Sequence, residues 1–140
     1  MIIDKHVYQS LLYTFLPVPP ETGCILGSKN GVICEFEYDM DSQELMAAIY
    51  TPNVKRLNQV ISDWRKRGID FCGLAHSHPS LQRTHSANDI SYIKTIMRSL
   101  PVSVDKLYFP LVFPNKDMVS FFALRGDTGI QILDDEIELY

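Results

Sequence analysis

A chain of 140 residues, of which 46% are hydrophobic and 21% charged, has the composition of a globular protein rather than a disordered one. At this length it can bury roughly two-thirds of the surface that its unfolded form exposes, so a single domain over residues 1–140 can form a core without cross-links. The formal net charge is -4 and the longest basic run is Arg65-Lys66-Arg67, which argues against nucleic acid as a partner.

The N-terminal residues and the cysteines indicate the cellular location of the protein. Residues 1–5 lack the pattern of a secretion signal, and no apolar run reaches the roughly 18 residues needed to cross a bilayer. The three cysteines, Cys24, Cys34 and Cys72, lie in apolar runs without C-x-x-C spacing, so we expect buried free thiols and no thiolate zinc site. A cytoplasmic protein that does not enter the membrane is the expectation.

The first elements in the chain are predicted to be a helix and a β-hairpin. Apolar residues recur at helical spacing over residues 5–16, with Asp4 as a cap and a run of prolines just beyond. Short apolar stretches over residues 23–26 and 32–38 flank Ser28-Lys29-Asn30-Gly31, which has the chemistry of a hairpin turn.

A turn, a short strand and a longer helix come next. The polar residues 39–42 predict the turn, and residues 44–49 predict the strand. Thr51, followed by a proline, is typical of the start of a helix, which we expect over residues 52–67 before Gly68. One apolar stripe is expected to face inward from this helix: Val54, Leu57, Val60, Ile61 and Trp64.

A buried strand over residues 71–75 is predicted to run directly into His76. Residues 79–85 have no periodicity and predict a loop, and a helix starts near Ser86 and ends before Pro101. Its inward positions are expected to be Ile90, Ile93 and Met97.

Three more strands complete the predicted fold, over residues 106–113, 118–125 and 129–133. The acidic residues 134–140 are expected to form a solvated tail. One α/β domain, with a mixed sheet covered by two or three helices, is the simplest architecture for this order of elements.

The end of the strand at His76 carries the residues with the strongest chemical signal. Successive side chains of an extended segment point to opposite faces, so His76 and His78 project the same way, and Pro79 stops the strand. Ser86 and Asp89 have the spacing of a helix capping box, which by itself accounts for both residues. Beside the two histidines, Asp89 is also a natural third ligand, in the open three-ligand arrangement of a catalytic zinc.

The segment His76-Ser77-His78-Pro79, six residues and then Ser86-Ala87-Asn88-Asp89 resembles the H-[ST]-H-P-x6-S-x-x-D signature of the JAMM metalloproteases, the metal-binding members of the MPN family. Such a set of residue types at fixed spacing arises by chance in well under about one chain in a thousand of this length. The order of elements over most of residues 1–133 is also similar to the family. The resemblance implies an MPN/JAB1 domain, a cytidine-deaminase-like α/β fold with a mixed β-sheet flanked by helices.

The family also has a glutamate upstream, in a stretch like E-T-x-G-I-L-x-G. The matching segment here begins at Glu21, with glycines at Gly23 and Gly27, each displaced by one position. The resemblance therefore implies Glu21 as the general base. Glu35 and Glu37 are the competitors, although their alternation with apolar residues is typical of a solvent-facing strand.

The resemblance implies a zinc-dependent metallopeptidase or isopeptidase of the compact prokaryotic type. His76, His78 and Asp89 would hold Zn2+, Glu21 would act as general base on the activated water, and Ser86 would donate a hydrogen bond to the carbonyl oxygen as it gains charge. The implied substrate is a protein or peptide: the C-terminus of a ubiquitin-like or sulfur-carrier protein, or a small peptide conjugate.

Two other functions stay open from the sequence. MPN scaffold proteins keep the fold and act as binding modules for protein partners, although every ligand position is filled here. Another metal hydrolase is the second alternative: a zinc deaminase would need H-x-E and P-C-x-x-C, which are absent, and a phosphoesterase would need further ligands. His85 is interpreted as a loop residue outside the signature, and His6 as a surface residue.

Overall fold

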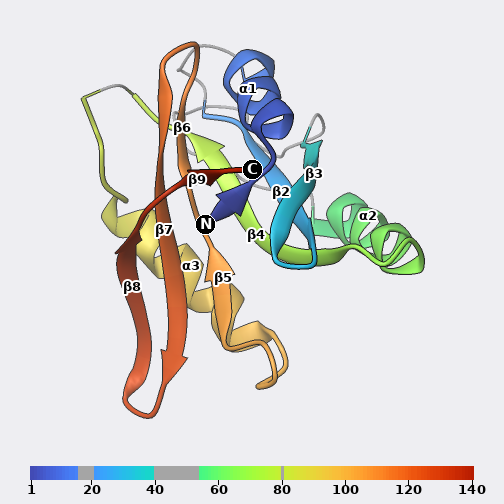
Figure 1. The fold of residues 1–140 in the computed structure, drawn as a ribbon. Helices are drawn as coiled ribbons and strands as arrows, with labels where there is room; N and C mark the ends of the chain where they lie inside the picture. Colours follow the sequence, from blue (N-terminus) through green and yellow to red (C-terminus); the bar gives the residue numbers. More distant parts are fainter. Residues whose placement is uncertain (16–20, 40–53, 80) are drawn as a thin grey trace.

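The computed structural model describes residues 1–15, 21–39, 54–79 and 81–140 (Figure 1). Within these ranges, nine strands form one mixed sheet and three helices pack on it, which confirms the predicted α/β class. The predicted strand over residues 44–49 lies outside the described residues. In chain order the elements are β1 (Ile2–Ile3), α1 (Lys5–Thr14), β2 (Gly23–Lys29), β3 (Val32–Tyr38), α2 (Val54–Lys66), β4 (Asp70–Ser77), α3 (Ala87–Ser99), β5 (Lys106–Tyr108), β6 (Leu111–Phe113), β7 (Asp117–Gly126), β8 (Gly129–Asp135) and β9 (Glu138–Leu139).

Strand β4 lies in the interior of the sheet, whose order is β5-β7-β6-β4-β2-β3-β1-β9, with β8 on the outer side of β7. It pairs with β2 in antiparallel fashion on one side, and with β5 and β6 in parallel on the other. The C-terminal end of β4, where His76 lies, is therefore enclosed by strands on both sides.

The single strand predicted over residues 106–113 is wrong, because the chain forms two strands there, β5 and β6. Both pair with β7, and they are separated at Phe109 and Pro110. Proline has no N–H to contribute to a ladder, which explains the break. Its carbonyl instead accepts a hydrogen bond from the N–H of His76 at 3.4 Å.

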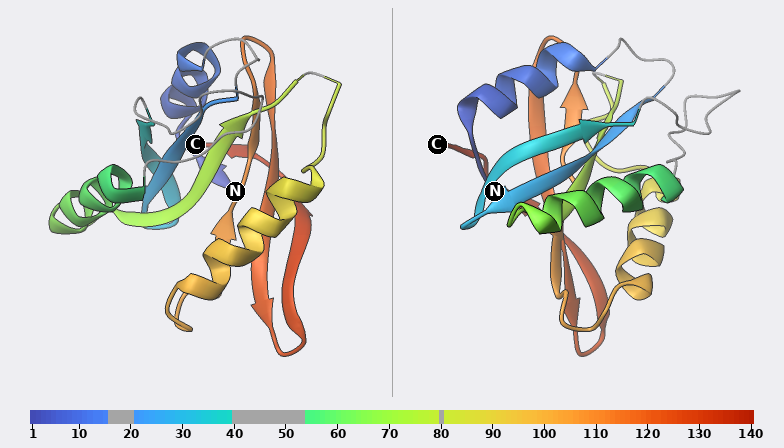
Figure 2. Two further views of the ribbon diagram at one scale, coloured as in Figure 1. Left: turned by 180° about the vertical axis from the view of Figure 1, so that it is seen from behind. Right: turned by 90° about the vertical axis from the view of Figure 1, so that its right-hand side faces the viewer.

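The predicted hairpin is confirmed as β2 and β3. Its turn residues Asn30 and Gly31 have φ of 53° and 79°, the conformation that a two-residue turn requires between twisted strands. In the right-hand view of Figure 2 this hairpin lies between α1 and α2.

The two larger of the three hydrophobic clusters among the described residues lie on opposite faces of the sheet. Cys24 and Leu26 pack in the cluster under α1, whereas Ile25, between them, packs in the cluster under α2 and α3. Strand β2 is thus buried on both faces, which is why it forms a continuous apolar run in the sequence.

Helices α1 and α2 end earlier than predicted, whereas α3 has the predicted bounds, and two expected core residues are exposed. Helix α1 ends at Thr14 and α2 at Lys66, each before its predicted last residue. Leu57 and Trp64 of α2 are buried as expected, but Val54 is 59% exposed at the first turn. Ile90 is also exposed, because it lies in the first turn of α3, whereas Ile93 and Met97 are buried.

The acidic residues 134–140 are mostly exposed, as expected, but part of the segment forms strands and it is not a free tail. The amino group of Met1 forms an ion pair with Asp135 Oδ2 at 2.9 Å, and Ser120 Oγ donates to the same oxygen at 2.8 Å. Strand β9 then pairs in parallel with β1 at the edge of the sheet. The acidic residues therefore join the two ends of the chain, through strands of two residues that are too short to show periodicity in the sequence.

The cysteines are free, as expected, but only in part buried. Cys24 is buried and Cys34 is exposed, so the expectation fails for Cys34. Burial raises the pKa of Cys24 above its ordinary value and that of Cys72 to about 12, so both are neutral thiols at physiological pH. As to the membrane, the described ranges contain no helix with the length and apolar character needed to cross one.

Replacing Gly73 with alanine should destabilise the fold next to the site. A Cβ at this position of β4 would lie 2.1 Å from the carbonyl oxygen of Tyr108, the residue that pairs with it on β5. Because this obstacle is backbone, Gly73→Ala is expected to lower the free energy of unfolding by about 1–3 kcal/mol in urea denaturation. Gly126→Ala is the control, since its Cβ would meet no atom nearer than 3.7 Å; an equal loss in both variants would contradict the explanation.

Candidate metal centre

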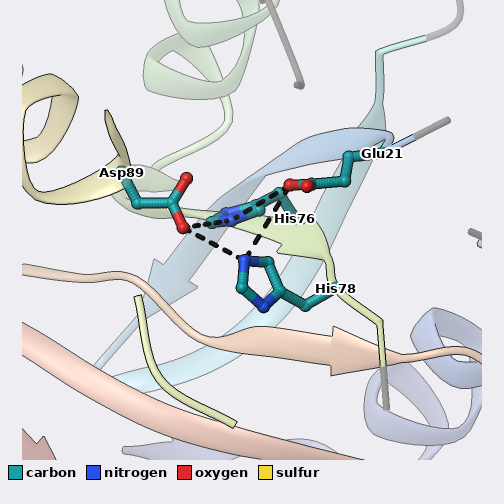
Figure 3. Close-up of side chains that lie close together, drawn as sticks. All are labelled: Glu21, His76, His78 and Asp89. Carbon is teal, nitrogen blue, oxygen red and sulfur yellow. Dashed lines mark hydrogen bonds and ion pairs between the residues drawn. The ribbon is translucent and has the colours of Figure 1, made fainter. Parts of the chain in front are cut away.

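Four side chains from three separate segments converge at the C-terminal end of β4. Figure 3 shows the polar ends of Glu21, His76, His78 and Asp89 turned toward one another, and one ligand atom from each lies within 4.8 Å of the others. Glu21 precedes β2, His76 lies in β4, His78 follows β4, and Asp89 lies in the first turn of α3. The structure thus brings together the residues that the sequence singled out as ligands and base.

The pairing of β2 with β4 explains how Glu21 reaches the histidines. His76 lies opposite Gly23 in the antiparallel ladder, so the chain just before β2 lies beside the end of β4. Ser77 extends this pairing: its N–H donates to the carbonyl of Thr22 at 2.8 Å, and its Oγ accepts from the N–H of Thr22 at 2.9 Å. Because strand side chains alternate, Ser77 points away from the histidines and binds the residue after Glu21.

The capping box predicted at α3 is present, and it uses the same Asp89 oxygen that faces the histidines. The Asp89 N–H donates to Ser86 Oγ at 3.1 Å, and the Ser86 N–H donates to Asp89 Oδ2 at 2.9 Å. The same Oδ2 lies 3.4 Å from Nε2 of His76 and 3.1 Å from Nε2 of His78. The cap therefore orients the Asp89 carboxylate toward the histidines.

A hydrogen bond on the far side of His78 fixes which nitrogen faces the centre. Nδ1 lies 2.7 Å from the carbonyl oxygen of Gln82, and since a carbonyl only accepts, Nδ1 must carry the proton. In the neutral ring, Nε2 then has the lone pair that a metal requires. Burial by itself lowers the pKa of His78, but hydrogen bonding to Asp89 and Gln82 outweighs it and the pKa is raised.

The pKa shifts of the other two proposed ligands leave each in the protonation state that can bind a metal. Burial lowers the pKa of His76 in spite of the neighbouring carboxylate, so this ring is neutral at physiological pH. Burial also opposes ionisation of Asp89, yet hydrogen bonding to the histidines holds the pKa of its carboxyl well below the ordinary value. Neutral imidazole and ionised carboxylate are the forms in which these side chains bind a metal.

The spacing of the donor atoms fits a tetrahedral ion with Glu21 somewhat further out. Ligands about 2.0–2.1 Å from a zinc ion lie roughly 3.3 Å from one another in a tetrahedron, close to the distances between Asp89 and the two histidines. Glu21 Oε1 is further away, at 3.8 Å from Nε2 of His76 and 4.0 Å from Nε2 of His78. These distances fit His76, His78 and Asp89 as three ligands, with the Glu21 carboxylate just outside the ligand sphere.

The competing glutamates lie away from the cluster. Glu35 forms an ion pair with Arg67 at 3.2 Å, and Glu37 forms one with Arg56. The displaced glycines do not move Glu21 out of the site. Gly27 adjoins a β-bulge. A Cβ at this position would lie 2.6 Å from the Ile69 side chain, so close packing against the sheet explains the glycine here.

His85 is the site residue that sequence reasoning underestimated. It lies in the loop before α3, as expected, but its side chain is only 3% exposed. Its ring centroid is 5.6 Å from that of His76 and 4.8 Å from that of Phe121. The JAMM spacing signature leaves residue 85 unspecified, so it could not indicate that His85 lies at the cluster. The remaining histidine, His6, is exposed as predicted.

Comparisons with known proteins support the fold and leave the activity open. No protein-family model and no curated protein matches the sequence. Among solved structures, the chain is similar to protein DSY2949 from Desulfitobacterium hafniense, with a TM-score of 0.67 and 18% identity over 100% of this chain and 94% of that one. It is similar to AF2198, a JAB1/MPN domain protein from Archaeoglobus fulgidus, with a TM-score of 0.54 and 15% identity over 99% and 98% of the two chains. A protein from Salinibacter ruber has a TM-score of 0.62 and 11% identity over 100% and 92%.

Likeness at such low identity concerns the fold alone. The similarity to AF2198 confirms the predicted fold class, a mixed α/β fold of the JAB1/MPN type. Together with the Glu, His, His and Asp cluster, this gives an MPN-like fold with side chains that could hold a metal ion.

If the cluster binds zinc, the metal should stabilise the folded protein. At a free zinc concentration 100 times the dissociation constant, the gain is about 2.7 kcal/mol, which raises the melting temperature by several degrees in a thermal scan. His76→Ala should abolish the zinc-dependent shift, measured against its own metal-free form, while the exposed His6→Ala should keep it. The same shift in His76→Ala as in the parent would show that zinc binds elsewhere.

Proposed function

We propose that the protein is a zinc-dependent hydrolase of amide bonds, a peptidase or isopeptidase. The observation that supports this most directly is the geometry of the cluster, in which two imidazoles and one carboxylate have ligand spacing and a second carboxylate stands just outside it. A closed structural zinc site uses four protein ligands, whereas a catalytic site keeps one position open. His76, His78 and Asp89 are the proposed ligands.

Glu21 is the proposed general base. When bound, a zinc ion supplies Lewis acidity that brings the pKa of a coordinated water toward neutrality. The Glu21 carboxylate lies about 4 Å from both ligand nitrogens, in reach of a water between them, and so can take its proton. It would later pass that proton to the departing amine, which leaves an acid and an amine as products.

Ser86 is the proposed stabiliser of the charge that develops on the substrate oxygen. Its Oγ accepts the N–H of Asp89, which leaves the hydroxyl proton to donate outward from this exposed position. A positioned donor of this kind contributes about 3 kcal/mol to the transition state. The same serine would then both cap α3 and bind the substrate oxygen.

The proposed substrate is a protein or peptide, with the C-terminus of a ubiquitin-like or sulfur-carrier protein as the first candidate. The support for this class is the resemblance of the segment from His76 to Asp89 to the JAMM signature, together with the JAB1/MPN fold. Insertions that would hold a larger partner have little room, because only six residues separate α3 from β5.

Glu21→Gln should remove the base and leave the metal in place. The expected result is a fall in kcat/KM of about 100-fold or more on a ubiquitin-like fusion or a peptide panel, with zinc content unchanged. Glu35→Gln is the matched control, since Glu35 pairs with Arg67 away from the cluster. Full activity in Glu21→Gln would show that another group is the base, and hydrolysis of phosphate esters without hydrolysis of amides would overturn the proposed reaction.

Ser77→Ala should impair catalysis without loss of a ligand. The variant leaves the N–H of Thr22 without its acceptor, so the segment that carries Glu21 keeps only one of its two hydrogen bonds to Ser77 and is held less firmly. We expect kcat to fall about 10- to 100-fold with little change in zinc affinity. Ser120→Ala is the control, because it also removes a buried serine hydroxyl, but one that binds Asp135 beside the paired chain ends. It should keep the parent kcat at temperatures where both variants are folded. Equal kcat in the two variants would contradict this role of Ser77.

A further inference from the structure

The loop between His78 and α3 is fastened to the sheet by a residue that the proposed chemistry does not use, Arg83. Its guanidinium donates two hydrogen bonds of 2.8 Å, one to each carboxylate oxygen of Asp117 at the start of β7. We call this bidentate pair the Arg83–Asp117 fork. The guanidinium also lies over the ring of Phe113, 4.1 Å from its centroid, and Phe113 pairs with Asp117 in the β6–β7 ladder. Arg83 is therefore fixed in position and in orientation by one hairpin.

The fork is expected to add little to the stability of the whole fold. The side chains of Arg83 and Asp117 are 39% and 40% exposed, and ion pairs at such positions contribute little once screening by water and side-chain entropy are included. The consequence of the attachment is therefore local, in the backbone next to Arg83.

The peptide group between Gln82 and Arg83 is the part of the backbone that the fork fixes. The carbonyl of Gln82 belongs to this planar group, so its direction depends on how the residues on both sides are held. On one side, the N–H of Gln82 donates to the carbonyl of Pro79 at 2.9 Å. On the other side, the fork holds Arg83. These two attachments set the direction in which the Gln82 oxygen points.

The Gln82 oxygen in turn restrains the imidazole of His78. It lies 2.7 Å from Nδ1, whereas Nε2, on the other edge of the ring, lies 3.1 Å from Asp89 Oδ2 (Figure 3). The main chain of His78 is held separately, because its N–H donates to the carbonyl of Val112 in β6 at 3.0 Å. The freedom that is left to His78 is rotation of its side chain, and a bond to the second nitrogen is the usual way to fix a ligand ring.

We propose that Arg83 is a positioning residue for the metal ligand His78: through the Gln82 carbonyl, the fork keeps Nε2 of His78 facing the centre. This inference rests on the metal-binding part of the proposed function. Arg83 contacts neither metal nor substrate in this role and exchanges no proton. Without the fork, the peptide group between residues 82 and 83 can rotate and the imidazole loses its support, so metal binding would have to order both.

The positive charge of Arg83 allows two explanations to be separated by the sign of the effect. A guanidinium on this loop repels a divalent cation, so removal of the charge alone would tighten metal binding. Loss of a positioning contact would weaken it. Arg83→Met removes the charge and the fork but keeps much of the apolar stem, whereas Arg83→Lys keeps the charge and loses the bidentate geometry. Asp117→Asn weakens the same fork from outside the loop.

The experiment measures the dissociation constant of zinc, by competition with a chromophoric chelator, in the parent, these three variants and the control Arg67→Met. We expect Arg83→Met and Asp117→Asn each to weaken zinc binding about 10-fold, as for other groups that orient metal ligands, and Arg83→Lys to weaken it as well. The double variant should lose no more than either single variant, because both changes act on one fork. Arg67→Met should match the parent, since Arg67 forms an exposed ion pair with Glu35 away from the cluster.

A second measurement uses the metal-free protein and does not depend on activity. In NMR spectra, the ring N–H of His78 that faces Gln82 should exchange slowly with water in the parent and in Arg67→Met, and faster in Arg83→Met. The melting temperatures of the three metal-free proteins should be similar, so faster exchange would report local opening rather than global unfolding. Equal exchange in the parent and Arg83→Met would overturn the inference.

The remaining outcomes separate this inference from the proposed function. Zinc binding in Arg83→Met that is as tight as in the parent, or tighter, overturns the inference and leaves the proposed function intact. A loss of affinity in Arg83→Met without one in Asp117→Asn also overturns it, because the fork would not be the cause. If the parent binds no zinc, both fail. The expected pattern of zinc affinities in a protein that cleaves no amide supports the inference and overturns only the proposed reaction.

Discussion

The two hydrogen bonds between Thr22 and Ser77 are the contact on which the site depends. In a regular antiparallel ladder the second of these bonds would reach the Ser77 carbonyl, but here the N–H of Thr22 donates to the serine Oγ. The side chain thus takes the place of a backbone acceptor just where the chain leaves the sheet. Because Ser77 has the opposite orientation to the histidines on either side of it, one tripeptide both presents two imidazoles and holds the segment that carries Glu21. The alternation of side chains along a strand is sufficient to place the two histidines on one face and Ser77 on the other.

Asp89 connects the electrostatics of the site with the folding of α3. Its carboxylate accepts the N–H of Ser86 as part of the helix cap and also faces two histidine nitrogens. An acidic residue in the first turn is favourable in its own right, because it satisfies a backbone donor and interacts well with the helix dipole. The helix therefore holds the carboxylate in its working position before any cation arrives. A cation would then offset the concentration of negative charge from Glu21 and Asp89 in a mostly buried place.

The sequence allows the ligands to be predicted because the information is local. The alternation from His76 to His78 and the cap from Ser86 to Asp89 are both short-range patterns, and the structure brings the four side chains of the cluster together as the sequence predicts. Glu21 lies 55 residues before His76, so only the family resemblance pointed to it. The failures have equally physical reasons: Pro110 divides a strand for lack of an N–H, and two-residue strands at the chain ends have no periodicity. Burial of His85 depends on the β5–β6 junction, which is not visible from its neighbours in sequence.

The fixed length of the loop before α3 also has a physical cause. Its Gln82 carbonyl accepts from His78, its Arg83 forms two hydrogen bonds of 2.8 Å with Asp117 on β7, and its last residue binds Phe109. Arg83 also lies over the ring of Phe113, 4.1 Å from its centroid. Each anchor is tied to the sheet or to a ligand. An inserted residue between Pro79 and Ser86 would therefore have to break at least one of them, and the bond that orients His78 would be among those at risk. The six-residue spacing fits contacts made on both sides of the cluster, so the loop helps to position the candidate ligands.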